Sequence, residues 1–150
     1  FSDEWAQLSI ALFIKLEKLQ NDLKLAIKND EFVAFYQPKV DINSGKLVGA
    51  EALIRWRTRD NKLIAPGDFI PLSEKTGLVT DLDMIVFEKV LAFLRSSLDA
   101  GVECVPISVN FSRLHFSNEK FLPTLLQKME KYQVPAHLIE LELSVPVILL

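Results

Sequence analysis

Hydrophobic residues near the start of the chain recur at the spacing of an amphipathic helix. Within residues 8–29 they alternate at steps of four and three, which places these side chains on one stripe: Leu12, Leu16, Leu19, Leu23 and Ala26. The stripe could form a coiled-coil seam, although it covers only about two heptads. Packing of the helix against its own domain explains the same pattern, and the residues alone leave both interpretations open.

The pattern then changes to that of a β-hairpin. Residues 32–41 and 47–56 are rich in aromatic and β-branched side chains, which favour strands. The tetrapeptide Asn43-Ser44-Gly45-Lys46 between them is typical of a turn, because Asn and Gly tolerate positive φ. The spacing predicts an antiparallel pair of strands at the start of the domain.

After the hairpin, helical and extended patterns alternate. The predicted elements are a short helix over 68–75 that ends at Gly77, a helix whose capping box is Thr80 and Asp83, an apolar strand over 102–109, a helix capped by Ser117 and running to about residue 132, and a strand over 139–143. Strands that alternate with helices form βα units around a largely parallel sheet. Functional side chains in such folds lie at the carboxyl ends of the strands.

The composition narrows the function classes. The 150 residues carry a net charge of −3, which argues against binding of nucleic-acid polymers through a basic face. No stretch approaches the roughly 20 apolar residues that a membrane-spanning helix needs. Cys104 is the only cysteine, so an internal disulfide is impossible and a cytoplasmic location fits. We expect Cys104 to be a buried small hydrophobe, and His115 and His137 to be surface residues in polar loops.

Three acid or amide side chains lie near predicted strand ends, namely Glu51, Asn110 and Glu142. Carboxylate and amide oxygens are hard ligands that suit Mg²⁺ or Mn²⁺ rather than zinc or copper. Glu51 lies among apolar neighbours, where a carboxylate is unfavourable unless it is paired or binds a metal. The spacing alone fits equally a solvated glutamate, half of an ion pair, and an asparagine satisfied within a turn.

Five ordered motifs resemble those of the EAL domain family. Glu51-Ala52-Leu53 matches the signature tripeptide of that family. The other motifs, in chain order, are Tyr36-Gln37-Pro38-Lys39-Val40-Asp41, then Asp68-Phe69-Ile70-Pro71-Leu72-Ser73-Glu74 with Thr76-Gly77-Leu78, then Val109-Asn110-Phe111-Ser112, and finally Leu141-Glu142-Leu143-Ser144. The resemblance covers residues 16–150.

The resemblance implies an α/β fold, namely the N-terminal half of a TIM-like (β/α)8 barrel whose first strand is antiparallel. A linker helix would occupy residues 1–29, and the truncated EAL domain would occupy residues 30–150. The implied activity is that of a cyclic-di-GMP phosphodiesterase, a hydrolase that uses Mg²⁺ or Mn²⁺ to open cyclic-di-GMP to linear pGpG in bacterial second-messenger signalling.

The resemblance also implies roles for individual residues. Glu51, Asn110 and Glu142 match positions that bind metal in the family. Arg55 matches a contact to the substrate phosphate, a task that suits the forked guanidinium group. Gln37 and Leu53 match positions that line the ligand groove. Taken without the resemblance, Arg55 could be a surface charge and Gln37 a hydrogen-bonding residue at a strand end.

Two departures from the family pattern bear on activity. Active members usually carry a glutamate three residues after the position of Glu142, where this chain has Val145, and an apolar side chain cannot hold the neighbouring loop by hydrogen bonds. The paired aspartates, the catalytic lysine and a later glutamate of the family would follow Leu150, so this chain alone is expected to be inactive. The alternative function is that of a catalytically degenerate module, either a cyclic-di-GMP receptor or a protein-interaction scaffold.

Half a barrel would also expose an apolar sheet edge. Such an edge can be covered in a homodimer, by another chain, or by the rest of a larger polypeptide. The leading helix resembles the linker that joins EAL domains to a sensor or GGDEF-type domain. Further domains of that kind could tether the protein to a membrane.

Overall fold

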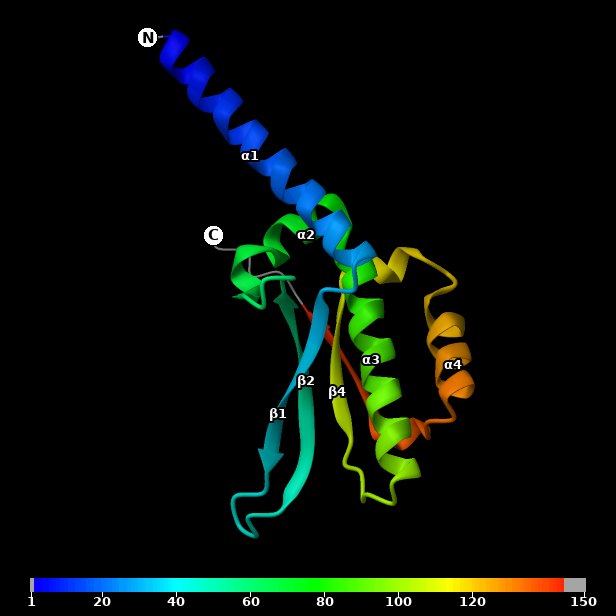
Figure 1. Cartoon of the computed structure of the whole chain (residues 1–150). Coiled ribbons are helices and arrows are strands. Elements are labelled where there is room, and N and C mark those ends of the chain that lie inside the picture. Colours follow the sequence, from blue (N-terminus) through cyan, green and yellow to red (C-terminus); the bar gives the residue numbers. More distant parts are fainter. Residues whose placement is uncertain (1, 145–150) are drawn as a thin grey trace.

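The computed structural model describes residues 2–144. The helices and strands are α1 (Ser2–Lys28), β1 (Phe32–Val40), β2 (Leu47–Arg57), β3 (Leu63–Ile64), α2 (Ile70–Thr76), α3 (Val79–Asp99), β4 (Ile107–Ser112), α4 (Phe121–Tyr132) and β5 (Ile139–Ser144). Short 3-10 helices cover Pro66–Asp68, Arg113–Ser117 and Ala136–Leu138. Residues 2–144 form one mixed sheet with two helices, α3 and α4, along one face, while α1 and α2 lie at the end of the sheet (Figure 1).

The sheet confirms the predicted α/β class. Its strand order is β1-β2-β4-β5, and the short β3 pairs with the end of β2. β1 runs antiparallel to β2, whereas β2, β4 and β5 run parallel. In the turn of the hairpin, the carbonyl of Asp41 accepts a hydrogen bond of 2.8 Å from the Gly45 amide, and Gly45 takes a φ of +69°. The hairpin, its turn and the parallel units were therefore predicted correctly.

The main core lies between the sheet and α3, with α4 at its side. From β4, Ile107, Val109 and Phe111 are buried in this core, and from α3 it receives Phe87 and Leu91. Side chains alternate between the two faces of a strand, so the residues between them point to the opposite face. That second face carries no helix among residues 2–144 (Figure 1) and is mostly polar.

A second core cluster anchors the C-terminal end of α1. Leu23 and Ala26 are buried there together with Phe32, Trp56 and Phe69. The three aromatic rings form a triangle with centroid distances of 5.5, 5.6 and 5.7 Å. Packing of the helix on its own domain is thus confirmed for the C-terminal part of the stripe.

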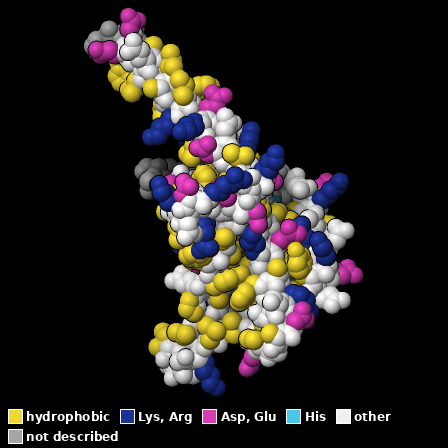
Figure 2. Space-filling model, in the orientation of Figure 1, with side chains coloured by type: hydrophobic (Ala, Val, Ile, Leu, Met, Phe, Trp, Pro, Cys, Tyr) yellow, Lys and Arg dark blue, Asp and Glu magenta, His cyan; other side chains and the backbone are white. Residues whose placement is uncertain are grey.

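The N-terminal part of α1 projects away from the domain (Figure 1). Leu12 and Leu16 lie on the same stripe as Leu23 but are exposed, and hydrophobic side chains follow this projecting part in Figure 2. The helix spans Ser2–Lys28, so at its N-terminal end it extends beyond the periodic pattern of residues 8–29. No helix within residues 2–144 is both long and apolar enough to cross a bilayer.

Two predicted helix caps are wrong. Thr80 and Asp83 form no capping box, because α3 begins at Val79 and the Thr80 hydroxyl donates a hydrogen bond of 3.0 Å to the carbonyl of Gly77. Ser117 does not cap α4, which begins at Phe121, and its hydroxyl donates to the carbonyl of Leu114.

The strand predicted over 102–109 is shifted to Ile107–Ser112. The amide of Val102 is used to close the end of α3, where it donates to the carbonyl of Ser97. Pro106 lacks an N–H group and joins the sheet only through its carbonyl, which accepts from the Ala50 amide at 3.0 Å. The ladder of β4 therefore starts after the proline.

The hydrophobic stripe of α1 is exposed in its N-terminal part and buried in its C-terminal part. Substitution of one leucine from each part should therefore change the free energy of unfolding by different amounts. Leu23→Ala should lower the free energy of unfolding by about 2–5 kcal/mol, because Leu23 is 0% exposed and its loss leaves a cavity. Leu12→Ala, at a position that is 57% exposed, should change it by less than about 0.5 kcal/mol. Urea unfolding of both variants measures the difference, and equal effects would contradict this packing.

Candidate functional site

Glu51 and Asn110 meet on the uncovered face of the sheet. They belong to the neighbouring parallel strands β2 and β4, in which Glu51 is level with Ser108. The Asn110 side-chain amide donates a hydrogen bond of 3.2 Å to Oε1 of Glu51. Both residues are half-buried, so the carboxylate predicted to need a partner has one.

Glu142 lies on the next strand, directly opposite Asn110 in the β4–β5 register. The side chains of Glu51, Asn110 and Glu142 therefore project from the same face. Oε1 of Glu142 lies 3.7 Å from Nζ of Lys39, which is its ionic partner. The structure brings Glu51 and Asn110 into contact and places Glu142 one strand away.

This donor set fits a hard divalent cation in its chemistry, because it offers two carboxylates and an amide oxygen. Within residues 2–144, no three His, Cys, Asp or Glu side chains lie close enough together to hold an ion by themselves. The amide of Asn110 is the group that links the two carboxylate positions, through a hydrogen bond on one side and the strand register on the other.

A second polar network, missed at the level of sequence, lies on the same face. Nζ of Lys39 donates to the Ser108 hydroxyl at 2.8 Å, and that hydroxyl donates to Oε2 of Glu140 at 3.0 Å. Lys39 therefore joins β1 to both carboxylates of β5, Glu140 and Glu142. The alternation of side chains along a strand could have revealed that these residues share the face of the site. Lys39 is two positions from Gln37, and Glu140 is two positions from Glu142.

The three predicted substrate-binding residues lie around Glu51. Gln37 is exposed on β1 and pairs with Glu51 in the β1–β2 register. Leu53 and Arg55 follow on β2 and are half-buried. Both line a cavity of about 200 Å³ that Asn110 also borders. One guanidinium nitrogen of Arg55 donates to the carbonyl of Ile54 at 2.8 Å.

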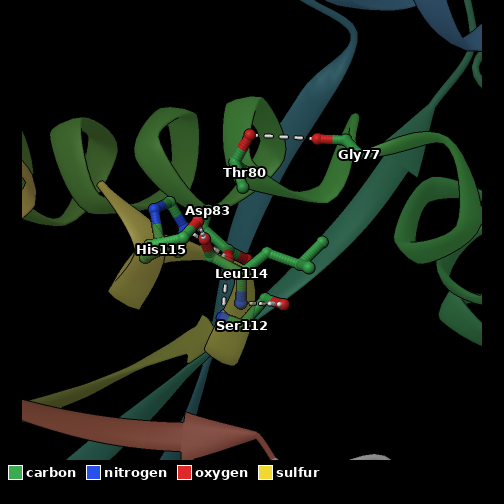
Figure 3. A network of polar contacts seen from close by, with 7 residues as sticks. Gly77, Thr80, Asp83, Ser112, Leu114 and His115 are labelled. Carbon is green, nitrogen blue, oxygen red and sulfur yellow. Dashed lines mark hydrogen bonds and ion pairs between the residues drawn. The ribbon is translucent and has the colours of Figure 1, made fainter.

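His115 was predicted to be a surface residue, and this prediction is wrong. Its side chain is 5% exposed, and Nε2 lies 2.9 Å from Oδ2 of Asp83 (Figure 3). The ring stacks on Phe121 at 4.5 Å and meets the edge of Phe111. The histidine is buried because a carboxylate satisfies its polar edge while aromatic rings cover its faces.

Asp83 ties α3 to the segment that follows Asn110. Its Oδ2 also accepts a hydrogen bond of 2.9 Å from the backbone amide of Ser112, two residues after Asn110 (Figure 3). Burial raises the pKa of the Asp83 carboxyl above its usual value, although the bonds from Ser112 and His115 act to lower it. In the sequence, Asp83 stands out as an aspartate among apolar positions of a helix, and there it resembled a capping residue.

The remaining single-residue predictions have mixed outcomes. Cys104 is half-buried and packs against the main core, so it is less enclosed than predicted. His137 is exposed, as predicted. Val145 lies outside the residues that the structure describes.

Comparison with known proteins identifies the family. The sequence profile of the EAL domain matches residues 20–149. The chain belongs to the EAL domain family. Among curated relatives, it is 36% identical over 122 residues to the signaling protein YkoW of Bacillus subtilis, and the match covers 81% of this chain and 15% of YkoW.

A second relative of this EAL domain is MucR of Pseudomonas aeruginosa, a bifunctional diguanylate cyclase/cyclic di-GMP phosphodiesterase. The identity is 36% over 123 residues, which cover 81% of this chain and 18% of MucR. The solved MucR phosphodiesterase in complex with c-di-GMP superimposes with a TM-score of 0.74 at 35% identity, covering 85% of this chain and 51% of that one. The chain thus spans about half of that solved structure and less than a fifth of either curated relative. The barrel half predicted from the motifs is confirmed.

Removal of the Asp83 carboxylate should loosen the segment after Asn110. Asp83→Ala leaves the buried Ser112 amide and His115 ring without their acceptor, and we expect a loss of about 2–4 kcal/mol in the free energy of unfolding. Asp81→Ala is the matched control, because Asp81 is exposed on the same helix. The free energy of unfolding of this variant should lie within about 0.5 kcal/mol of the wild-type value. Thermal or urea unfolding compares the two. A stable Asp83→Ala protein would remove the structural role assigned to this pair.

Proposed function

We propose that this chain is the N-terminal half of a module that hydrolyses cyclic-di-GMP to linear pGpG in the intact protein. The observation that carries the proposal is the Glu51–Asn110 hydrogen bond on the uncovered sheet face, with Glu142 one strand away. The likeness to MucR, which was solved with c-di-GMP, supports the choice of ligand.

Glu51, Asn110 and Glu142 would hold Mg²⁺ or Mn²⁺ through their side-chain oxygens. The bound metal would supply charge neutralisation at the phosphate and a lowered pKa for a water molecule. Lys39 would balance the charge of Glu142 and hold its carboxylate toward the middle of the sheet. Residues of the intact protein beyond this chain would complete the site.

The nucleotide would lie over the ends of β1 and β2. Arg55 would bind a phosphate, because its side chain reaches the cavity that Asn110 borders and the guanidinium fork can grip two oxygens. Leu53 would contact the ligand from the same cavity wall, and Gln37 from the adjacent strand.

A second candidate function is that of a non-catalytic cyclic-di-GMP receptor or scaffold. The observation that favours it is Val145, which stands where active members of the family usually carry a glutamate. Without that carboxylate, the loop beside the metal would be less well held and turnover would fall. Ligand binding through Arg55 does not depend on that carboxylate.

We further propose how the module fits into the intact protein. Residues 1–29 would link the EAL domain, residues 30–150, to a sensor or GGDEF-type domain, and the protein would act in the cytoplasm. The exposed stripe of α1 would bring two copies together as a homodimer, since Leu12 and Leu16 continue a stripe that is buried farther along the helix.

The first functional prediction concerns the metal ligand Glu51. In the intact protein, Glu51→Gln should reduce hydrolysis of cyclic-di-GMP by more than the roughly 10–100-fold typical of residues that only support a ligand. Glu140→Gln is the control, since Glu140 lies on the same face and accepts a hydrogen bond from Ser108, a role that Gln retains. Chromatography of pGpG measures both. Full activity of Glu51→Gln at saturating Mn²⁺ would remove Glu51 from the site.

The second functional prediction separates the two function classes. If the missing carboxylate limits turnover, Val145→Glu in the intact protein should raise hydrolysis by roughly 10–100-fold and leave the Kd for cyclic-di-GMP nearly unchanged. A protein that binds the nucleotide and stays inert after this change would be a receptor. A protein that neither binds nor hydrolyses cyclic-di-GMP would be an interaction scaffold.

A further inference from the structure

Arg57 forms a second cationic position beside Arg55. The two residues are separated by one position on β2, so both side chains project from the uncovered face. Phe35, on the same face of β1, lies opposite Leu53. The guanidinium carbon of Arg55 lies 5.7 Å from the centre of the Phe35 ring, and that of Arg57 lies 5.9 Å from it. One ring therefore holds two guanidinium groups at the carboxyl end of β2.

These two cations lack an acidic partner in the part of the chain that the structure describes. The ion pairs there involve Lys39, Lys89, Arg95, His115 and Lys128, but neither Arg55 nor Arg57. The face of an aromatic ring attracts a cation but offsets little of the repulsion between two of them. An anion bound by both guanidinium groups would relieve that repulsion.

The position of Arg57 is fixed although its side chain is exposed. Its backbone amide donates a hydrogen bond of 2.8 Å to the carbonyl of Glu31, so β2 is still held in the sheet at this residue. Phe35 is 37% exposed, which leaves part of its ring open on the same face. The backbone of Arg57 is therefore held by the sheet, and its guanidinium group lies over the Phe35 ring.

We infer that Arg57 is a second phosphate-binding residue of the nucleotide site, oriented by Phe35 next to Arg55. The inference rests on the proposed function, because it takes a cyclic dinucleotide as the ligand. Such a ligand carries two phosphates. Two guanidinium forks that lie over one ring, without acidic partners among residues 2–144, match this pair of charges. Phe35 acts as a positioning residue, since its ring orients both arginines.

The test is the affinity of the intact protein for cyclic-di-GMP, measured by calorimetry with Ca²⁺ in place of the catalytic metal. Arg57→Gln should raise the Kd about tenfold, which corresponds to about 1.4 kcal/mol, and should weaken its dependence on salt. Arg57→Lys retains the charge and should recover part of the affinity. Phe35→Leu should raise the Kd less than Arg57→Gln does, because both charges remain.

Arg59→Gln is the matched control, since it removes the same charge two residues later, outside β2, where no ring among residues 2–144 contacts the guanidinium group. It should bind like wild type. If Arg57→Gln binds like wild type while Arg55→Gln loses binding, or if Arg57→Gln and Arg59→Gln weaken binding equally, the inference is wrong and the proposed ligand stands. If wild type itself does not bind cyclic-di-GMP, the proposed function fails, and the inference fails with it.

Discussion

The packing of α3 against one face of the sheet is the constraint on which the rest of the structure depends. Phe87 and Leu91 of the helix meet Val109 and Phe111 of β4, and these side chains are almost fully buried. Because alternate residues of a strand point to opposite faces, burial of these positions sends Ser108 and Asn110 to the other side. The polar face of the sheet is thus a geometric consequence of the apolar face. A shift of β4 by one residue would point Ser108 and Asn110 into the core.

The pair of the buried His115 and the half-buried Asp83 extends this constraint from the core toward the site. It joins α3 to the backbone at Ser112, so the segment after Asn110 is held by the same helix that buries the strand. The carboxylate is unfavourable in such a place unless its acceptor sites are used, and the Ser112 amide and the histidine use them. Core packing and the position of Asn110 are therefore coupled through one side chain.

The sequence predicted those features that depend on local pattern. The hairpin, the alternation of strands with helices, and the position of Glu51 and Asn110 near strand ends all follow from periodicity and turn residues. That these two residues belong to one site was implied by the family resemblance, and the structure places their strands side by side. Several errors arose where a distant partner overrides a local preference. Asp83 resembles a capping residue within its own helix, but the Ser112 amide, which lies far along the chain, takes its carboxylate. His115 resembles a loop residue until the rings that cover it are known. The ion pair of Lys39 with Glu142 depends on the order of the strands, which residue spacing does not give.

The central claim is that the polar face of this sheet is half of a phosphodiesterase site for cyclic-di-GMP. The most direct measurement is incubation of the intact protein with cyclic-di-GMP and Mn²⁺, followed by ion-exchange separation of the nucleotides. The account predicts that cyclic-di-GMP is converted to linear pGpG and that a chelator stops the conversion. Cyclic-di-GMP that remains unchanged after prolonged incubation with excess Mn²⁺ would contradict it.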